Sequence, residues 1–392
     1  MSADDAAIWD ELARDMTAWR HDLHAHPEFG FSETRTAAQV AAALRSFGLN
    51  EVVEGVGGTG VVATLTRGAG ARRIGLRADM DALKIQEKAD HTHASRHSGV
   101  MHACGHDGHT AMLLGAAKSL VQDPDFEGTV RFIFQPAEEW GRGALAMLED
   151  GFLDRFPVDE IYGLHNWPGL AVGRFETCVG PLMSAEDNFE IVLTGQGGHA
   201  SRPQHIRETL VAACALVMSL QTIVSRRLDP ADTAVVSATE LLTDGTRNVL
   251  PGEARILGDV RSFRAEVSAA VEAEMRRMAA GIAETYGLTA QVTYSREFVP
   301  LVNHAAQTAH AVAAARRVFG EAAVTADRPP ITASEDFARF LEHIPGCFAF
   351  VGNGEDSAPL HNARFDFADS GLVPGARYLA EVAKMRARPE RA

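Results

Sequence analysis

The chain has 392 residues, of which 46% are hydrophobic and 23% charged, and this composition is typical of a globular protein too long for a single ordinary core. A formal net charge of -15 argues against the clustered basic surface that nucleic-acid binding needs, so we expect no nucleic-acid partner. No stretch approaches the roughly 20 apolar residues of a membrane span. The acidic N-terminus and four scattered cysteines therefore favour a cytoplasmic protein with no membrane partner.

The first part of the chain alternates between predicted helices and strands. Helical periodicity covers residues 8–48, with an interruption at 26–30. Strands are then expected at 61–66, 73–77, 129–135 and 160–164, and helices at 110–121 and 144–149. This alternation predicts an α/β fold with a mostly parallel sheet covered by helices on both faces.

The order of elements changes after Pro181. Strand, helix, strand, strand, helix and strand are expected in turn at 188–194, 208–227, 233–242, 253–263, 266–286 and 289–297. This order is that of the split ferredoxin-like α+β unit. We therefore predict an inserted domain over 183–297 and a first domain made of 1–182 together with 298–392. In the C-terminal part of that first domain, helices at 304–319 and 371–385 flank a strand at 347–351.

Residues 101–110 carry three imidazoles, a thiol and a carboxylate just before a predicted helix. Cys104 and His106 are two residues apart, so in extended backbone both side chains project to the same side and can hold one metal or straddle two. A buried thiol beside a hydrogen-bonded histidine is the alternative. It is less favoured because Gly105 and Gly108 remove bulk from a corner that is crowded with histidines.

The adjacent carboxylates of Glu138 and Glu139 follow an apolar strand. Neighbouring residues in extended chain point to opposite sides, so one carboxylate can bind metal while the other faces the substrate. Beside a cation and an apolar wall, this free carboxylate can serve as general base and then as general acid. A solvated acidic pair opening a helix is the alternative, which the apolar run at 132–134 disfavours.

Two further histidines, His165 and His361, follow predicted strands. Each alone would more often be structural than a ligand, but the carboxyl ends of the strands of an open α/β sheet are where ligands bind. Together, the candidate metal ligands suffice for two ions that share a ligand and a water. They are Cys104, His106, Glu139, His165 and His361.

The remaining histidines receive no functional prediction. Those in a polar stretch are expected to be exposed, namely His91, His93 and His97, and those at helix ends and in loops are left unassigned, namely His21, His24 and His26. The glycine-rich turn at 195–201 carries one histidine, and it lacks the lysine and spacing of a phosphate-binding loop.

With these motifs, the chain resembles the metal-dependent aminoacylase and carboxypeptidase family, and specifically its hippurate hydrolase and auxin-conjugate amidohydrolase branch. The resemblance covers nearly the whole length. The matching motifs lie at 20–28, 76–83, 102–109, 135–139, 163–165, 197–200, 248–251, 334–337 and 360–362.

The resemblance implies a two-metal hydrolase that cleaves the amide of N-acyl-amino acids, with the five candidate ligands holding the ions. Glu138 would be the general base, and Asp79 would orient a ligand from behind. Arg77 stands where many relatives have a histidine, which leaves the metal open: a thiolate favours zinc or cobalt, whereas manganese is often associated with the branch.

For the inserted domain, the resemblance implies a dimerisation or lid role, and hence a homodimer or dimer-based oligomer. His199 would reach a neighbouring active site to stabilise the oxyanion. Asn248 and Arg261 match positions that bind substrate oxygen or carboxylate.

Two other functions remain open. One is a metal-dependent dipeptidase or carboxypeptidase, which would accept a free peptide amine. The other is a non-catalytic, metal-binding regulatory protein. Glu138 beside Glu139 argues against the second, because metal binding alone has no need for the extra base.

Overall fold

The computed structural model describes residues 3–68 and 72–388. These residues form two compact units: a smaller one made of 183–301 and 330–334, and a larger one made of the rest. Among the described residues, no helix has both the length and the apolar character needed to cross a membrane.

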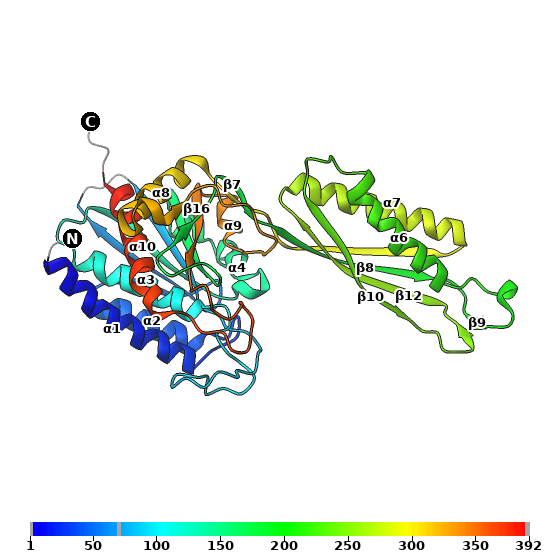
Figure 1. Cartoon of the computed structure of the whole chain (residues 1–392), viewed down its shortest axis with the longest axis horizontal. Coiled ribbons are helices and arrows are strands. Elements are labelled where there is room, and N and C mark those ends of the chain that lie inside the picture. Colours follow the sequence, from blue (N-terminus) through cyan, green and yellow to red (C-terminus); the bar gives the residue numbers. More distant parts are fainter. Residues whose placement is uncertain (1–2, 69–71, 389–392) are drawn as a thin grey trace. The chain divides into compact units, whose positions relative to one another are not determined.

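The larger unit is built on an eight-stranded sheet (Figure 1). Its four central strands, β4, β3, β5 and β16, are parallel, while β1 and β2 on one side and β6 on the other join them through antiparallel pairs. The mostly parallel sheet predicted from the sequence is confirmed. In order across the sheet, the strands are β1 (Glu51–Val56), β2 (Gly60–Arg67), β4 (Gly128–Gln135), β3 (Arg73–Asp79), β5 (Glu160–Trp167), β16 (Gly346–Gly352), β6 (Phe175–Glu176) and β15 (Val324–Thr325).

The central strands of this sheet are buried on both sides, because helices pack on both of its faces. One face packs Leu76 and Phe132 against α1 (Ala3–Ala25), α2 (Thr34–Ser46), α3 (His106–Gln122), α8 (Ala305–Phe319) and α10 (Leu372–Ala387). On the other face lie the short helices α4 (Gly143–Glu149), α5 (Phe152–Arg155) and α9 (Ala338–Leu341). There, Phe348 of β16 packs against Phe337 with ring centroids 5.1 Å apart.

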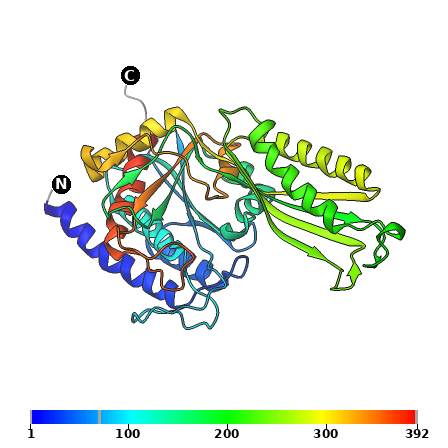
Figure 2. The ribbon, with the colours of Figure 1, turned by 45° about the vertical axis from the view of Figure 1, so that its right-hand side comes forward.

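Helix α3 is held between the N-terminal helix α1 (blue) and the C-terminal helix α10 (red), as Figures 1 and 2 show. Glycines permit the close approach: a Cβ added at Gly115 would lie 2.3 Å from the sulfur of Met16, and one at Gly375 would lie 2.0 Å from that of Met112. The first turn of α3 is therefore anchored by tight packing along the rest of the helix.

The smaller unit is a four-stranded antiparallel sheet in the order β10, β12, β8, β13, with two helices packed on it. Along the chain its elements are β8 (Ala185–Thr194), α6 (Leu210–Arg226), β10 (Ala234–Thr243), β12 (Glu253–Ser262), α7 (Ala265–Tyr286) and β13 (Thr289–Phe298). This β-α-β-β-α-β order confirms the predicted ferredoxin-like architecture.

Several short elements complete the two units. β9 (Gly198–His199) and β11 (Val249–Leu250) pair as a ribbon, and in Figure 1 β9 lies beyond one end of the four-stranded sheet. β7 (Gly180–Met183) pairs with β14 (Leu301–Asn303). Single 3-10 turns occur at η1 (Glu138–Trp140), η2 (Pro203–His205), η3 (Glu321–Ala323) and η4 (Asp369–Gly371).

Candidate metal centre

The candidate ligands of the larger unit gather at the carboxyl ends of its parallel strands. Asp79 ends β3, the turn η1 follows β4, and His361 lies in the segment after β16. His165 lies inside β5, because this strand runs three residues further than the sequence predicted. Cys104 and His106 enter from the turn that begins α3.

Unusual backbone conformations concentrate around this edge. Gly105 has φ +99°, and a Cβ there would lie 2.3 Å from the side-chain oxygen of Asn166, so glycine is required. Ala137 and His361 adopt left-handed φ values of 47° and 62°, and among described non-glycine residues only Phe31 shares this feature. Such strain persists where the surroundings enforce it, as they do at many active sites.

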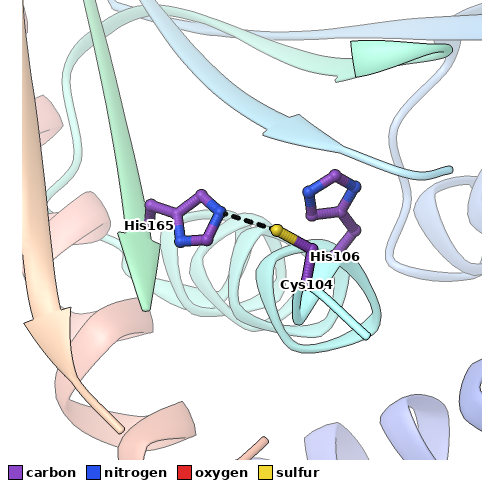
Figure 3. Close-up of side chains that lie close together, drawn as sticks. All are labelled: Cys104, His106 and His165. Carbon is purple, nitrogen blue, oxygen red and sulfur yellow. Dashed lines mark hydrogen bonds between the residues drawn. The ribbon is translucent and has the colours of Figure 1, made fainter. Parts of the chain in front are cut away.

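Cys104, His106 and His165 form the first group of potential ligands, whose donor atoms all lie within 4.8 Å of one another. In Figure 3 the three side chains point toward a common space, and Cys104 Sγ lies 3.3 Å from His165 Nε2. The other ring nitrogen of His165 is 2.6 Å from the backbone carbonyl of Asn166, to which it donates. Nε2 of His165 is therefore unprotonated and available to a metal.

His106 is oriented in a similar way by a carboxylate. Its Nδ1 lies 3.1 Å from Asp81 Oδ1, whereas its buried Nε2 has no hydrogen-bond partner among the described residues. Oxygens of Asp79, Glu138 and Glu139 lie 3.8 to 3.9 Å from that Nε2. These separations are too long for hydrogen bonds, but atoms that share a metal ion about 2 Å away lie roughly 3–4 Å apart.

Cys104, Glu139 and His361 form the second group within the same 4.8 Å limit, so the thiol belongs to both groups. Glu139 Oε2 lies 3.4 Å from His361 Nε2, and its buried Oε1 has no hydrogen-bond partner in the described chain. Glu138 is held differently, since its Oε1 accepts from the backbone N–H of Asp336 at 3.3 Å. The adjacent glutamates thus have different partners.

The electrostatics of the site fit bound cations. Burial, then Glu139 and Glu138, raises the pKa of Cys104 well above its usual value, and burial with Glu335 and Glu139 does the same for Glu138. Burial lowers the pKa of His165 far below normal, which keeps this ring neutral. A metal ion would stabilise the thiolate and the carboxylates and would bind the neutral imidazole.

The carboxylates around His106 also favour a positive charge at this position. Burial by itself lowers its pKa, but Asp79 and Asp81 outweigh that effect and raise it to about 10. A proton on this ring therefore balances the carboxylates that a metal ion would balance. Together with the unpartnered Nε2 of His106 and Oε1 of Glu139, this makes the donor set suitable for divalent metals.

Two residues that organise the centre received no role from the sequence alone. Asp81 contacts His106 and also accepts from the backbone N–H of Glu139 at 3.0 Å. Arg77 is fully buried and pairs with Asp79, Glu335 and Asp336 at 2.7, 2.9 and 3.1 Å. The two-residue spacing of Asp79 and Asp81, and a charged residue within an apolar strand, were the available signals.

The other candidates lie in the smaller unit. His199 and Asn248 are exposed on the β9–β11 ribbon, where Ala200 N–H donates to the carbonyl of Asn248 at 3.0 Å. Arg261 lies near the opposite end of β12. It pairs with Glu186, Asp259 and Ser334, at 2.8, 2.9 and 2.8 Å. The structure thus brings His199 and Asn248 together but not Arg261.

Several known proteins are similar to this chain over most of its length. Residues 75–385 match the model of Peptidase family M20/M25/M40. The chain is 39% identical to a hippurate hydrolase of Campylobacter jejuni over 93% of its length and 94% of the relative's. It is 38% identical to an N-acetyl-L-cysteine deacetylase of Bacillus subtilis, over 95% and 88% of the two chains.

A solved structure is also similar over nearly the whole chain. The YXEP protein of Bacillus subtilis, described as a dinuclear metal-binding peptidase of family M20, superimposes with a TM-score of 0.84 at 36% identity. The match covers 96% of this chain and 98% of that one.

Proposed function

The chain belongs to Peptidase family M20/M25/M40, and from this premise we propose that it is a metal-dependent amidohydrolase that cleaves N-acyl-amino acids to a carboxylate and a free amino acid. The observation that carries this proposal is the pair of ligand groups that share Cys104, with the buried carboxylate of Glu138 beside them. The hippurate hydrolase and N-acetyl-L-cysteine deacetylase relatives support the choice of substrate class.

Two divalent ions are the proposed cofactors, and the dinuclear description of the similar YXEP protein supports that number. When bound, such ions supply Lewis-acid polarisation of the scissile carbonyl and acidify water. The proposed ligands are Cys104, His106, Glu139, His165 and His361. The Cys104 thiolate favours zinc or cobalt over manganese.

Glu138 is the proposed general base. Its carboxylate faces His106 and is fixed by the backbone N–H of Asp336, so it can take a proton from water and return it to the leaving amine nitrogen. Burial, followed by the neighbouring carboxylates of Glu335 and Glu139, raises the pKa of Glu138 well above its usual value, which favours holding a proton taken from water. Asp79, held by Arg77 and by His109 at 2.6 Å, is proposed as the fixed anion behind the ligands.

We propose that the inserted domain over 183–297 pairs two chains, and that His199 of one chain stabilises the oxyanion in the other. Arg261 lies eight residues along β12 from Glu253, beside which the ribbon begins, a separation of about 26 Å at roughly 3.3 Å per residue. A small substrate cannot touch His199 and Arg261 of one chain, so their joint use requires two chains. Asn248 would act with His199.

The surface of the smaller unit supports this pairing. Strand β10 is at the edge of its sheet, and large apolar side chains are exposed on it and on α6. They include Val211, Met218 and Leu242, which are 54%, 71% and 48% exposed. Edge strands and apolar patches of this kind favour association.

Four free cysteines support the proposed cytoplasmic location.

Hydrolysis of a small panel tests the function. Protein stripped of metal is reloaded with zinc, cobalt or manganese and offered benzoyl-, acetyl- and indoleacetyl-amino acids beside free dipeptides. We expect metal-restored release of amino acid from the N-acylated compounds. Cleavage of dipeptides alone would support the dipeptidase or carboxypeptidase function instead, and no turnover with any metal would contradict the proposal.

A further inference from the structure

A second histidine cluster lies outside the candidate metal centre. It joins His24 near the end of α1, Glu87, His91 and His93 in the loop before Cys104, and Asp366 before α10. The expectation that His91 and His93 are exposed was wrong, since their side chains are 19% and 11% exposed. The side chain of His24 is fully buried.

The donor atoms of this histidine cluster are spaced like the ligands of one metal ion. Glu87 Oε1 lies 3.0 Å from His91 Nε2 and 3.2 Å from His24 Nε2. Asp366 Oδ1 lies 3.2 Å from His93 Nε2 and 4.0 Å from the same His91 Nε2. Ligands that share a first-row divalent ion are separated by roughly 3–4 Å. His91 is thus common to both sets of donors.

The ring nitrogens of His91 are poorly satisfied by the described residues. Both are buried and find no hydrogen-bond partner among the described residues, although Glu87 is within 3.0 Å of one of them. The ring also stacks on that of His93, with centroids 3.8 Å apart and planes at 16°. Buried polar atoms are seldom left unpaired, so a ligand at His91 is the physical expectation.

His24 has the second contact that metal-bound histidines use. Its Nδ1 lies 2.9 Å from Asp107 Oδ2, which directs Nε2 toward Glu87. A carboxylate behind the ring fixes its orientation and strengthens the opposite nitrogen as a ligand.

The charge balance also favours a cation. Three carboxylates contact the histidine cluster, those of Glu87, Asp107 and Asp366, and Arg20 contacts the last two at 3.2 and 2.8 Å. The carboxylate of Glu87 contacts His24, His91 and the backbone N–H of Ser95. Arg20 also donates to His93 Nε2 at 2.9 Å, so His24, Glu87 and His91 are the more available ligands.

We propose that this histidine cluster is an auxiliary binding site for one divalent transition-metal ion that imidazole favours, such as zinc, and that it shares no ligand with the candidate metal centre. The ion would link α1 with the loop that leads to Cys104, and so stabilise segments that flank the proposed catalytic ligands.

Metal counting tests the proposal. Wild-type protein and H91Q are stripped, reloaded with zinc, desalted and measured by mass spectrometry of metals. H91Q removes the ligand common to both donor sets, so we expect it to hold one zinc ion fewer per chain. The result is a difference between two proteins, so it holds whatever number of ions the candidate metal centre takes, and it does not depend on the proposed hydrolysis.

H97Q is the matched control, because His97 is exposed in the same loop and lies outside the histidine cluster. It should bind as much zinc as the wild type. E87Q preserves side-chain volume and should also hold one zinc ion fewer per chain. It gives a second measurement in case H91Q misfolds. We also expect added zinc to raise the Tm of stripped wild type more than that of either variant. Equal zinc content in wild type, H91Q and E87Q would overturn the proposal.

Discussion

The two units hold their candidate site residues in opposite environments. In the larger unit Asp79, His106 and His165 are buried, and each is fixed by a hydrogen bond from behind. In the smaller unit His199 and Asn248 lie exposed on a two-stranded ribbon. The larger unit is therefore preorganised by its own fold, whereas the roles that we propose for His199 and Asn248 depend on a second chain that faces the ribbon.

The strongest test of preorganisation is Arg77→Met. The change leaves Asp79, Glu335 and Asp336 buried without their counterion, and breaking such a buried pair costs about 3–5 kcal/mol. Urea unfolding measures the loss. Arg73→Met on the same strand is the control, because its pair with Asp159 is partly exposed and contributes about 1 kcal/mol or less. Equal losses in the two variants would contradict a preorganised larger unit.

His199→Ala tests the proposed role of the exposed ribbon in the smaller unit. Removing one oxyanion donor lowers kcat by about 100- to 1000-fold, and because the side chain is exposed the unfolding free energy should not change. Mixing this variant with Glu138→Gln chains should restore activity if His199 acts on its neighbour, since mixed dimers then contain one intact site. Without recovery after subunit exchange, the role in a second chain is wrong.

Asp81→Asn should have a smaller effect within the larger unit. The variant keeps the shape of the contact to His106 but removes its charge, and loss of such a supporting carboxylate weakens metal binding by about 10- to 100-fold. Competition with a chelator gives the affinity. Asp159→Asn, which alters an exposed pair, should leave it unchanged. If both variants bind metal like the wild type, Asp81 does not orient the ligand.

The architecture was predictable because hydrophobic periodicity and the β-α-β-β-α-β order are local signals. The two-residue spacing of Cys104 and His106 predicted that they approach each other in extended backbone, but the structure brings them together at a turn in which Gly105 is left-handed. The ion pair of Arg77 with Glu335 was not predictable, because the partners are 258 residues apart and meet only through the strand order. The contacts of His24 with Glu87 and His91 also depend on how loops fold back on α1.

The most direct test of the account compares wild type with Glu138→Gln, both stripped and reloaded to equal metal content, in hydrolysis of an N-benzoyl-amino acid. We expect the variant to retain the metal but to lose about 100- to 10,000-fold in kcat, because a positioned general base contributes on this scale. Unchanged turnover at equal metal content would contradict the assignment of Glu138, and with it the proposed division of labour between the adjacent glutamates.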